Sequence, residues 1–162
     1  MGVFERRLRE RDERRSMILR AARDQILRHG LEQVRMSGIA REAELSKGTL
    51  YLYFRDKTDL MYALLLESLE DLRDRVASVL DHTGSAMDKV EALIERYIDF
   101  YRERQHFFPL FRYLDYAFST GVATGSTAAA CFSVIDDLTA QVEPLLQDGG
   151  VDGSFRPALE PK

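Results

Sequence analysis

Residues 30–60 read GLEQVRMSGIAREAELSKGTLYLYFRDKTDL, and this stretch decides the fold. It predicts two short helices joined by a tight turn. The first helix covers residues 36–43, where the apolar side chains fall on one helical face. The second covers residues 46–54 and opens with Ser46, whose hydroxyl is a favourable N-cap. Two short helices in this order are the layout of a helix-turn-helix.

The second helix has the side chains that suit entry into the major groove of DNA, which is about 12 Å wide. Gly48 lets the backbone approach the duplex closely, Lys47 is a charged donor, and Thr49 presents a hydroxyl and a methyl group. Tyrosine hydroxyls further along can reach phosphates. The residues predicted to contact double-stranded DNA are Ser46, Lys47, Gly48, Thr49, Tyr51 and Tyr53, with a phosphate contact from Lys57.

The rest of the chain carries helical periodicity and no sustained strand alternation, so we predict an all-α fold. Residues 14–29 form one amphipathic stripe, and residues 1–13 are expected to be a flexible arm. A long amphipathic helix follows from residue 58 to residue 80. Further helices are predicted after Ser85, near Pro109 and over residues 128–145, and a loop is predicted over residues 119–127. The expected division is a DNA-binding domain at 1–57 and a second helical domain at 58–162.

Composition excludes several protein classes. Of 162 residues, 45% are hydrophobic and 31% charged, which gives enough apolar material for a core and no signature of disorder. No run approaches the roughly 20 apolar residues of a spanning helix. The first fifteen residues are highly charged and unlike a signal peptide, and the one cysteine has no internal disulfide partner. We therefore expect a cytoplasmic protein, associated with the nucleoid when bound to DNA, and not a membrane protein.

The charges are unevenly distributed along the chain. The formal net charge is −4, but residues 1–60 carry +4 and residues 61–162 carry −8. A basic N-terminal third joined to an acidic remainder suggests an anionic partner for the first part alone. The phosphate backbone of nucleic acid is the commonest such partner.

No motif for catalysis or metal binding is present. His29, His82 and His106 have no companion at metal-ligand spacing. Cys131 lies on an apolar stripe and reads as a small core residue. The chain has no nucleophile elbow, P-loop or dinucleotide-binding glycine pattern. We therefore expect no enzymatic activity, no metal and no cofactor.

The pattern across residues 18–60 resembles the TetR family of one-component bacterial regulators. The resemblance is carried at fixed spacings by Ile18, Ala21, Ala22, Gly30, Ile39, Ala40, the run 46–54, Lys57 and Leu60. It implies three N-terminal helices that bind DNA and a long fourth helix that leads to a ligand-binding domain. It also implies dimers that bind palindromic operators and release them when a small molecule binds. Residues 153–157 (GSFRP) look like the loop before the family's last two helices.

Three features depart from the family pattern. The turn of the helix-turn-helix has Glu44 where glycine is usual, so a non-glycine residue must take the turn's backbone conformation at some cost. Arg35 stands where a serine or threonine N-cap is usual, and its charge can hold a phosphate instead. Two further helices, which build the dimer interface in the family, are not found in this sequence. A homodimer is expected if those helices are present.

The segment 97–118 holds nine of the sixteen aromatic residues. Aromatic walls suit an apolar ligand cavity, although helical aromatics more often form core. The residues predicted to line an effector pocket are Tyr97, Tyr101, Phe107, Phe111 and Tyr116.

These observations indicate a sequence-specific DNA-binding transcriptional regulator. The resemblance favours a repressor that a small, largely apolar effector releases from a palindromic operator. The alternative is a helical protein that binds a small molecule or a partner and whose DNA-binding head is vestigial.

Overall fold

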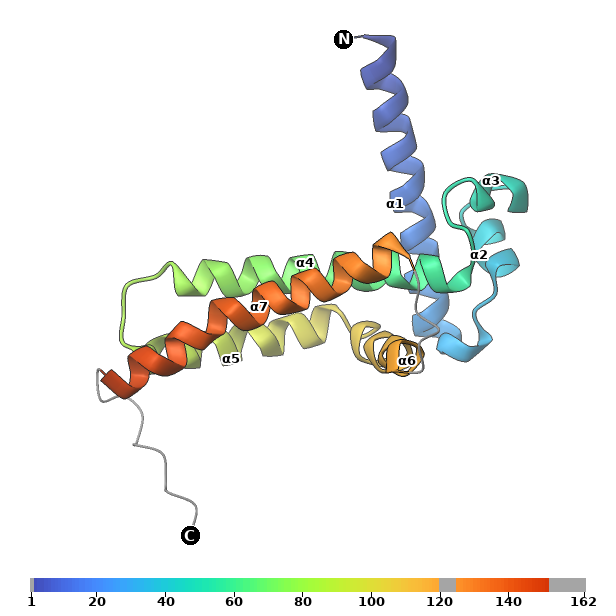
Figure 1. Cartoon of the computed structure of the whole chain (residues 1–162). Coiled ribbons are helices and arrows are strands. Elements are labelled where there is room, and N and C mark those ends of the chain that lie inside the picture. The colour runs from blue at the N-terminus through green and yellow to red at the C-terminus, as the bar shows by residue number, and fades with distance from the viewer. Residues whose placement is uncertain (1, 120–124, 152–162) are drawn as a thin grey trace. The chain divides into compact units, whose positions relative to one another are not determined.

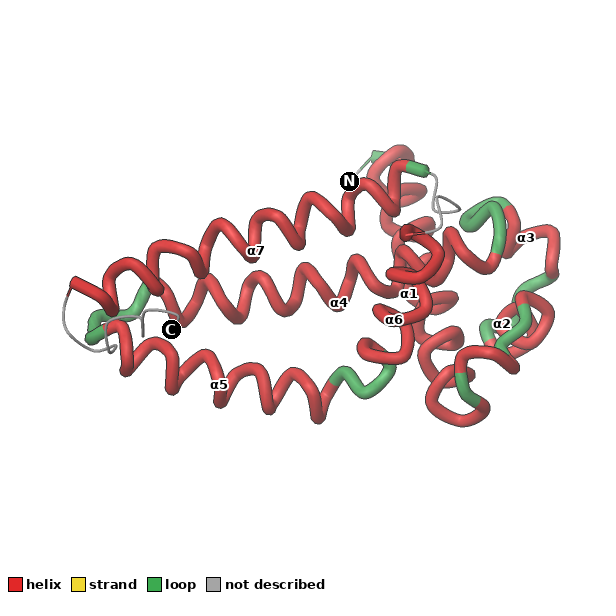
Figure 2. Tube along the Cα trace, turned by 60° about the horizontal axis from the view of Figure 1, so that its bottom comes forward, coloured by secondary structure: helices red, strands yellow, loops and turns green. Residues whose placement is uncertain are grey.

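The computed structural model describes residues 2–119 and 125–151, and within them every regular element is helical (Figures 1 and 2). The expected all-α fold with an N-terminal helix-turn-helix is confirmed. The helices of the described residues are α1 (Val3–His29), the 3-10 helix η1 (Leu31–Gln33), α2 (Met36–Glu42), α3 (Lys47–Tyr51), α4 (Lys57–Leu80), α5 (Ala86–Glu103), α6 (Phe107–Ser119) and α7 (Ser126–Val151).

The chain forms two compact units. Unit 1 comprises Met1–Leu65 and Gln105–Ala128, and unit 2 comprises Leu66–Arg104 and Ala129–Lys162. Unit 1 therefore holds more than the predicted domain 1–57, because α6 and the beginning of α4 group with the N-terminal helices. Unit 2 is built from the remainder of α4 with α5 and α7, which lie side by side (Figure 2).

The first helix is longer than the sequence predicts, and the expected flexible arm over residues 1–13 is helical from Val3 onward. Local pairing explains the difference. The Glu5 carboxylate accepts a hydrogen bond of 2.9 Å from the Gly2 amide at the helix start. Ion pairs one turn apart follow between Arg6 and Glu10 and between Arg9 and Glu13, each at 3.8 Å. Such pairs stabilise helices by a few tenths of a kcal/mol each.

The core of unit 1 lies where α1 packs against α2 and η1. Side chains at helical spacing on α1 are buried, Ile18 and Ala22 among them, together with Ile39 of α2 and Leu50 of α3. At the edge of this core, Gln25 donates a hydrogen bond of 2.5 Å to Glu42, and Arg28 forms an ion pair with the same carboxylate. The buried residues of α1 and α2 thus follow the helical periodicity that the sequence predicts.

Unit 2 is tied together by charged groups between α4 and α5. Asp71 accepts a hydrogen bond of 3.0 Å from Arg104 and pairs with Arg75 at 3.2 Å. Arg75 also pairs with Glu103 and lies over the Phe100 ring. The hydrogen bond that Arg75 donates to the Glu103 carboxylate raises the pKa of Arg75 above its usual range. These groups are partly exposed, so they fix the register of the two helices more than they add stability.

The apolar stripe of α5 is only partly covered. Tyr101 and Ile94 are each 55% exposed, and Tyr97 is 46% exposed. The middle of the predicted loop 119–127 lies outside the described residues. The GSFRP segment, residues 153–157, also lies outside them. No helix in the described ranges is long and apolar enough to cross a membrane.

Candidate nucleic-acid interface

The turn between α2 and α3 is a complete Schellman motif. The amide of Leu45 donates to the Ala40 carbonyl at 2.8 Å, and the amide of Glu44 donates to the Arg41 carbonyl at 3.2 Å. These two bonds satisfy carbonyls that the end of α2 would leave unpaired. The motif turns the chain sharply, so that α3 begins only a few residues after α2 ends.

Glu44 occupies the left-handed position of this motif, with φ 55°. Among the described residues it is the only non-glycine with a positive φ. Glycine is usual at this position because a Cβ atom there crowds the backbone, at a cost of about 1–2 kcal/mol. The prediction that a non-glycine takes the turn's conformation is confirmed.

Ser46 caps α3, as the sequence predicts. Its Oγ accepts a hydrogen bond from the Thr49 amide at 3.0 Å and lies 2.9 Å from the Thr49 hydroxyl. The helix proper is shorter than predicted and ends at Tyr51, since Leu52 caps it and forms a turn with Tyr53. Leu50 and Phe54 are buried, which fixes the other face of α3 toward solvent.

The solvent-facing side of α3 carries most of the predicted DNA contacts. Ser46, Lys47 and Gly48 are exposed, and the Tyr51 side chain is 51% exposed. Thr49 and Tyr53 are half-buried. A Cβ atom built on Gly48 would have only Ser46 Oγ within 4 Å, at 3.8 Å. The protein itself therefore has room for a larger residue at this position.

The predicted phosphate-binding cations differ in their surroundings. Arg35 is exposed at the start of α2, where its side chain makes no capping hydrogen bond. The Lys57 ammonium donates a hydrogen bond of 2.9 Å to the Leu31 carbonyl, and burial lowers its pKa. An ammonium has three donors, so this contact leaves two for a phosphate. Lys57 thus also joins α4 to η1.

The start of α4 has a cap that the sequence interpretation missed. Asp56 accepts a hydrogen bond of 2.8 Å from the Asp59 amide, and this bond lowers the pKa of the Asp56 carboxyl. An aspartate three residues ahead of an amphipathic run is a signal that could have found it.

Leu52 is not among the predicted contacts, yet it is 79% exposed directly after α3. An exposed leucine there can contact a thymine methyl.

The predicted effector-pocket residues fall in both units. Tyr97 and Tyr101 lie on α5 in unit 2. Phe107 and Phe111 lie on α6 in unit 1, where their rings stack with centroids 5.7 Å apart. Tyr116 belongs to α6, but its side chain lies outside the described part. Phe107 is buried, which is the ordinary role of a core aromatic.

Unit 2 contains an open apolar groove of about 400 Å³ between α4, α5 and α7. Of the predicted pocket residues, Tyr97 lines it. Apolar side chains form nearly all of its wall, and the charged groups beside it are Arg75 and Arg96. The apolar lining residues are Leu72, Val76, Val90, Leu93, Ile94, Val142 and Leu145.

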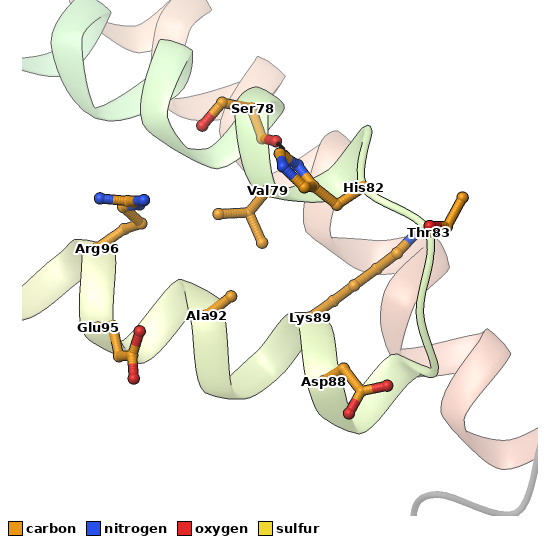
Figure 3. A pocket seen from close by; sticks show the side chains of 9 residues that line it. All are labelled: Ser78, Val79, His82, Thr83, Asp88, Lys89, Ala92, Glu95 and Arg96. Carbon is orange, nitrogen blue, oxygen red and sulfur yellow. Dashed lines mark hydrogen bonds between the residues drawn. The ribbon is translucent and has the colours of Figure 1, made fainter.

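A second, smaller pocket of about 230 Å³ lies where α4 ends and α5 begins (Figure 3). Its polar groups mainly close helix ends. Lys89 donates a hydrogen bond of 3.0 Å to the Leu80 carbonyl, and the His82 ring donates one of 2.5 Å from Nδ1 to the Ser78 carbonyl. No group of three or more histidine, cysteine, aspartate or glutamate residues in the described part could hold a metal ion.

Comparison with known proteins identifies the helix-turn-helix segment. Residues 18–64 match the family described as bacterial regulatory proteins, tetR family. This helix-turn-helix segment is of the TetR family. The match begins at the first buried residue of α1 and ends within α4, so it covers α2, the turn and α3 in full.

Relatives with curated names extend the likeness beyond this segment. The chain is 30% identical over 133 residues to the HTH-type transcriptional activator FasR of Mycolicibacterium smegmatis, covering 81% of this chain and 61% of that protein. It is 30% identical over 80 residues to the fatty acid metabolism regulator protein of Bacillus subtilis, covering 49% of this chain and 41% of that protein. The chain thus spans about half the length of these relatives. Both are named as regulators, which supports the expectation that the chain is not an enzyme.

Solved structures share the architecture. A TetR family transcription regulator from Marinobacter aquaeolei VT8 aligns with a TM-score of 0.60 at 25% identity, over 87% of this chain and 73% of that chain. The ketosteroid transcriptional regulator KstR2 of Mycobacterium tuberculosis aligns with a TM-score of 0.70 at 22% identity, over 91% of this chain and 73% of that chain. The likeness to KstR2 concerns the fold alone.

Proposed function

We propose that this chain is a DNA-binding transcriptional regulator that reads its operator with α3. The observation that carries the proposal is the exposed, capped α3 that follows a complete Schellman turn. Its free face presents a cation, a glycine and a half-buried hydroxyl in succession, at Lys47, Gly48 and Thr49. The ammonium of Lys47 and the hydroxyl of Thr49 are donors of the kind that read base edges in the major groove. The phosphate contacts come from Arg35, Ser46, Tyr51, Tyr53 and Lys57.

The operator is a palindrome bound by a homodimer, with half-sites one helical turn apart, about 34–36 Å. Repression is the mode that the family resemblance favours. The relative FasR is named an activator, so activation is the second candidate. A reporter gene behind the selected operator distinguishes the two, because deletion of the regulator raises expression if it represses and lowers expression if it activates.

Selection of duplexes from a random library tests the DNA-reading role of α3. Wild-type protein enriches one motif. Thr49→Ala relaxes the preference at one position by about 1–3 kcal/mol. The matched control is Thr83→Ala, because Thr83 is exposed in unit 2 and far along the chain from α3. If the variant at residue 49 enriched the same motif with the same stringency as wild type, Thr49 would not read a base.

We further infer that the effector is a molecule with a long apolar chain, held in the groove of unit 2. The apolar wall of the groove supports this, and so does the Bacillus subtilis relative's name, a fatty acid metabolism regulator. Arg75 and Arg96 at the groove suit a carboxylate or another anionic head group. The acidic network around Arg75 leaves Arg96 as the better candidate for that contact.

Calorimetric titration with dodecanoate, hexadecanoate and their coenzyme A thioesters tests the groove. Ile94 lines the groove and Ile98 does not, although both are exposed isoleucines on α5. Ile94→Ser is expected to weaken binding about tenfold, since burying such a side chain contributes about 1.5–3 kcal/mol. Ile98→Ser is the control and is expected to bind as wild type. Equal effects of the two substitutions would place the ligand elsewhere.

A further inference from the structure

The N-terminal part of α1 extends well beyond the core that it serves. Every described side chain from Phe4 to Met17 is exposed, and Ile18 is the first buried residue of the helix. At 1.5 Å per residue, the helix runs about 22 Å from Val3 to Ile18. In Figure 1 this part of α1 continues beyond α2 and α3.

The charges of this extension are sorted between two sides of the helix. On one side Arg6 pairs with Glu10 and Arg9 pairs with Glu13. The other side continues the line of Ile18 toward the N-terminus at steps of three or four residues, which share one helical face. That line contains Arg15, Arg14, Arg11 and Arg7, and no acidic residue.

The arginines of this second side are available for a partner. Within the part of the chain that the structure describes, no ion pair or hydrogen bond engages the side chains of Arg7, Arg11 or Arg14. The same segment contains four acidic residues, so ion pairs that neutralise these three arginines were also possible. The chain instead uses Glu10 and Glu13 to neutralise the arginines of the opposite side. The result is a row of cations without counter-charges.

The arginine side of the extension looks toward the helix-turn-helix. The Arg15 guanidinium lies over the Phe54 ring at 5.6 Å from its centroid. Phe54 directly follows Tyr53, a predicted phosphate contact, and its amide donates to the Leu50 carbonyl of α3 at 3.1 Å. The row of arginines therefore begins beside the end of the recognition helix and leads away from it.

We propose that the extension of α1 is a second DNA-contacting element, which binds backbone phosphates of DNA flanking the site read by α3, through Arg7 and Arg11. This inference rests on the proposed DNA-binding function. Duplex DNA carries one charge per about 1.7 Å of its axis, so a row of arginines about 12 Å long, from Arg7 to Arg15, faces several phosphates. The 22 Å extension matches about six base pairs of flanking DNA, at 3.4 Å per base pair.

A second copy of the chain is the competing occupant, because Phe4 and Leu8 are also exposed on this side. Charge argues against it. Two identical copies that met through this side would bring unpaired arginines together, and such like-charge contacts are costly. The phosphate backbone supplies the opposite charge over the same length.

The test compares two double variants that remove the same charge from the same helix. R7A/R11A removes the unpaired cations, and R6A/R9A removes two exposed cations from the ion-paired side. Fluorescence anisotropy gives the dissociation constant of each for a selected duplex with about ten base pairs of flank on each side, and for the same duplex trimmed to the selected site. Salt is varied from 50 to 200 mM, and circular dichroism checks that both variants fold.

R7A/R11A is expected to lose affinity on the long duplex alone. Each phosphate contact contributes about 0.9 to the slope of log K against log salt, so the slope falls by about 1.8 per bound chain. At 0.15 M salt the loss of one contact lowers the affinity for DNA about fivefold, and the loss of two lowers it roughly thirtyfold. On the trimmed duplex R7A/R11A and R6A/R9A are expected to bind alike.

Three results would overturn the inference. If the two variants bound the long duplex equally well, or if R7A/R11A lost as much on the trimmed duplex, the extension would not contact flanking DNA. If R7A/R11A changed the sedimentation coefficient of the free protein, this side would contact a second copy. Wild-type protein that selected no duplex at all would overturn the proposed function itself, which separates that failure from the other three.

Discussion

Replacement of Gly48 by alanine separates the role of α3 in folding from its role in DNA recognition. The added methyl group has only Ser46 Oγ within 4 Å, at 3.8 Å, which is an ordinary contact. Alanine is favoured over glycine in a helix by about 0.8–1.0 kcal/mol. The free energy of unfolding of Gly48→Ala is therefore expected to rise, by about 0.5–1 kcal/mol.

DNA binding is expected to change in the opposite direction. If the α3 backbone approaches the duplex at Gly48, the methyl group must enter a close-packed interface, and overpacking of this kind costs about 1–3 kcal/mol. That range corresponds to a loss of about five- to 150-fold in affinity. Urea denaturation measures the first effect, and fluorescence anisotropy on the selected duplex measures the second.

Gly38→Ala is the matched control. Gly38 lies on α2 and is not among the predicted DNA contacts, and its Cβ would meet the flexible end of Gln25 at 3.2 Å. Its DNA affinity is expected to stay within about twofold of wild type. Unchanged affinity in Gly48→Ala would refute the close approach of the α3 backbone to DNA. A lower free energy of unfolding in that variant would show that the position is not open.

Three further predictions concern stability and reactivity. Glu44→Gly is expected to raise the free energy of unfolding by about 1 kcal/mol because it relieves the positive φ. The control Glu91→Gly, in the exposed face of α5, is expected to lower it by about as much. Thermal melts in which both melting temperatures shift in the same direction would contradict this. Lys57→Met is expected to lower the free energy of unfolding by about 1 kcal/mol, since Leu31 loses a charged donor, and to lower the salt slope of DNA binding by about one; an unchanged slope would remove Lys57 from the interface. Burial raises the pKa of the Cys131 thiol to about 12, so iodoacetamide is expected to modify the folded protein over a hundredfold more slowly at pH 8.5 than the urea-unfolded protein. The raised pKa also makes the folded state lose stability as pH rises above about 9. In the labelling experiment, rapid modification of the native protein would show that α7 opens.

The sequence predicted the DNA-binding head well because each of its features has a local cause. The cap at Ser46 depends on a hydroxyl three residues before an amide. The burial of Leu50 and Phe54 depends on helical spacing. The positive φ of Glu44 was expected from the family pattern, in which glycine is usual at this position of the turn.

Features that depend on distant residues could not be read in this way. The bond between Lys57 and the Leu31 carbonyl joins residues 26 positions apart, so lysine in the sequence indicated a phosphate contact alone. The aromatic residues of 97–118 are close in sequence, yet the structure divides them between unit 1 and unit 2. Tyr97 belongs to a groove whose other walls come from α4 and α7. Tertiary packing decides such placements, and periodicity does not report it.

The extension of α1 shows a different limit. Its charges alternate closely in sequence and suggested a flexible, solvated arm. The helical arrangement places acids and arginines four apart on one side and leaves the remaining arginines in a row. A net charge summed over residues 1–60 reports the excess of basic residues. It does not show on which face of the helix those residues lie.

Sequence-specific recognition by α3 can be measured by fluorescence anisotropy on DNA from upstream of the protein's own gene. The wild-type chain and Tyr51→Ala are compared at 50 and 200 mM salt, each against an excess of a scrambled duplex of equal length. Wild-type binding is expected to survive the competitor at both salt concentrations and to be lost in Tyr51→Ala. Binding that the scrambled duplex abolishes equally in both proteins would show attraction to phosphates alone, and it would contradict sequence-specific recognition by α3.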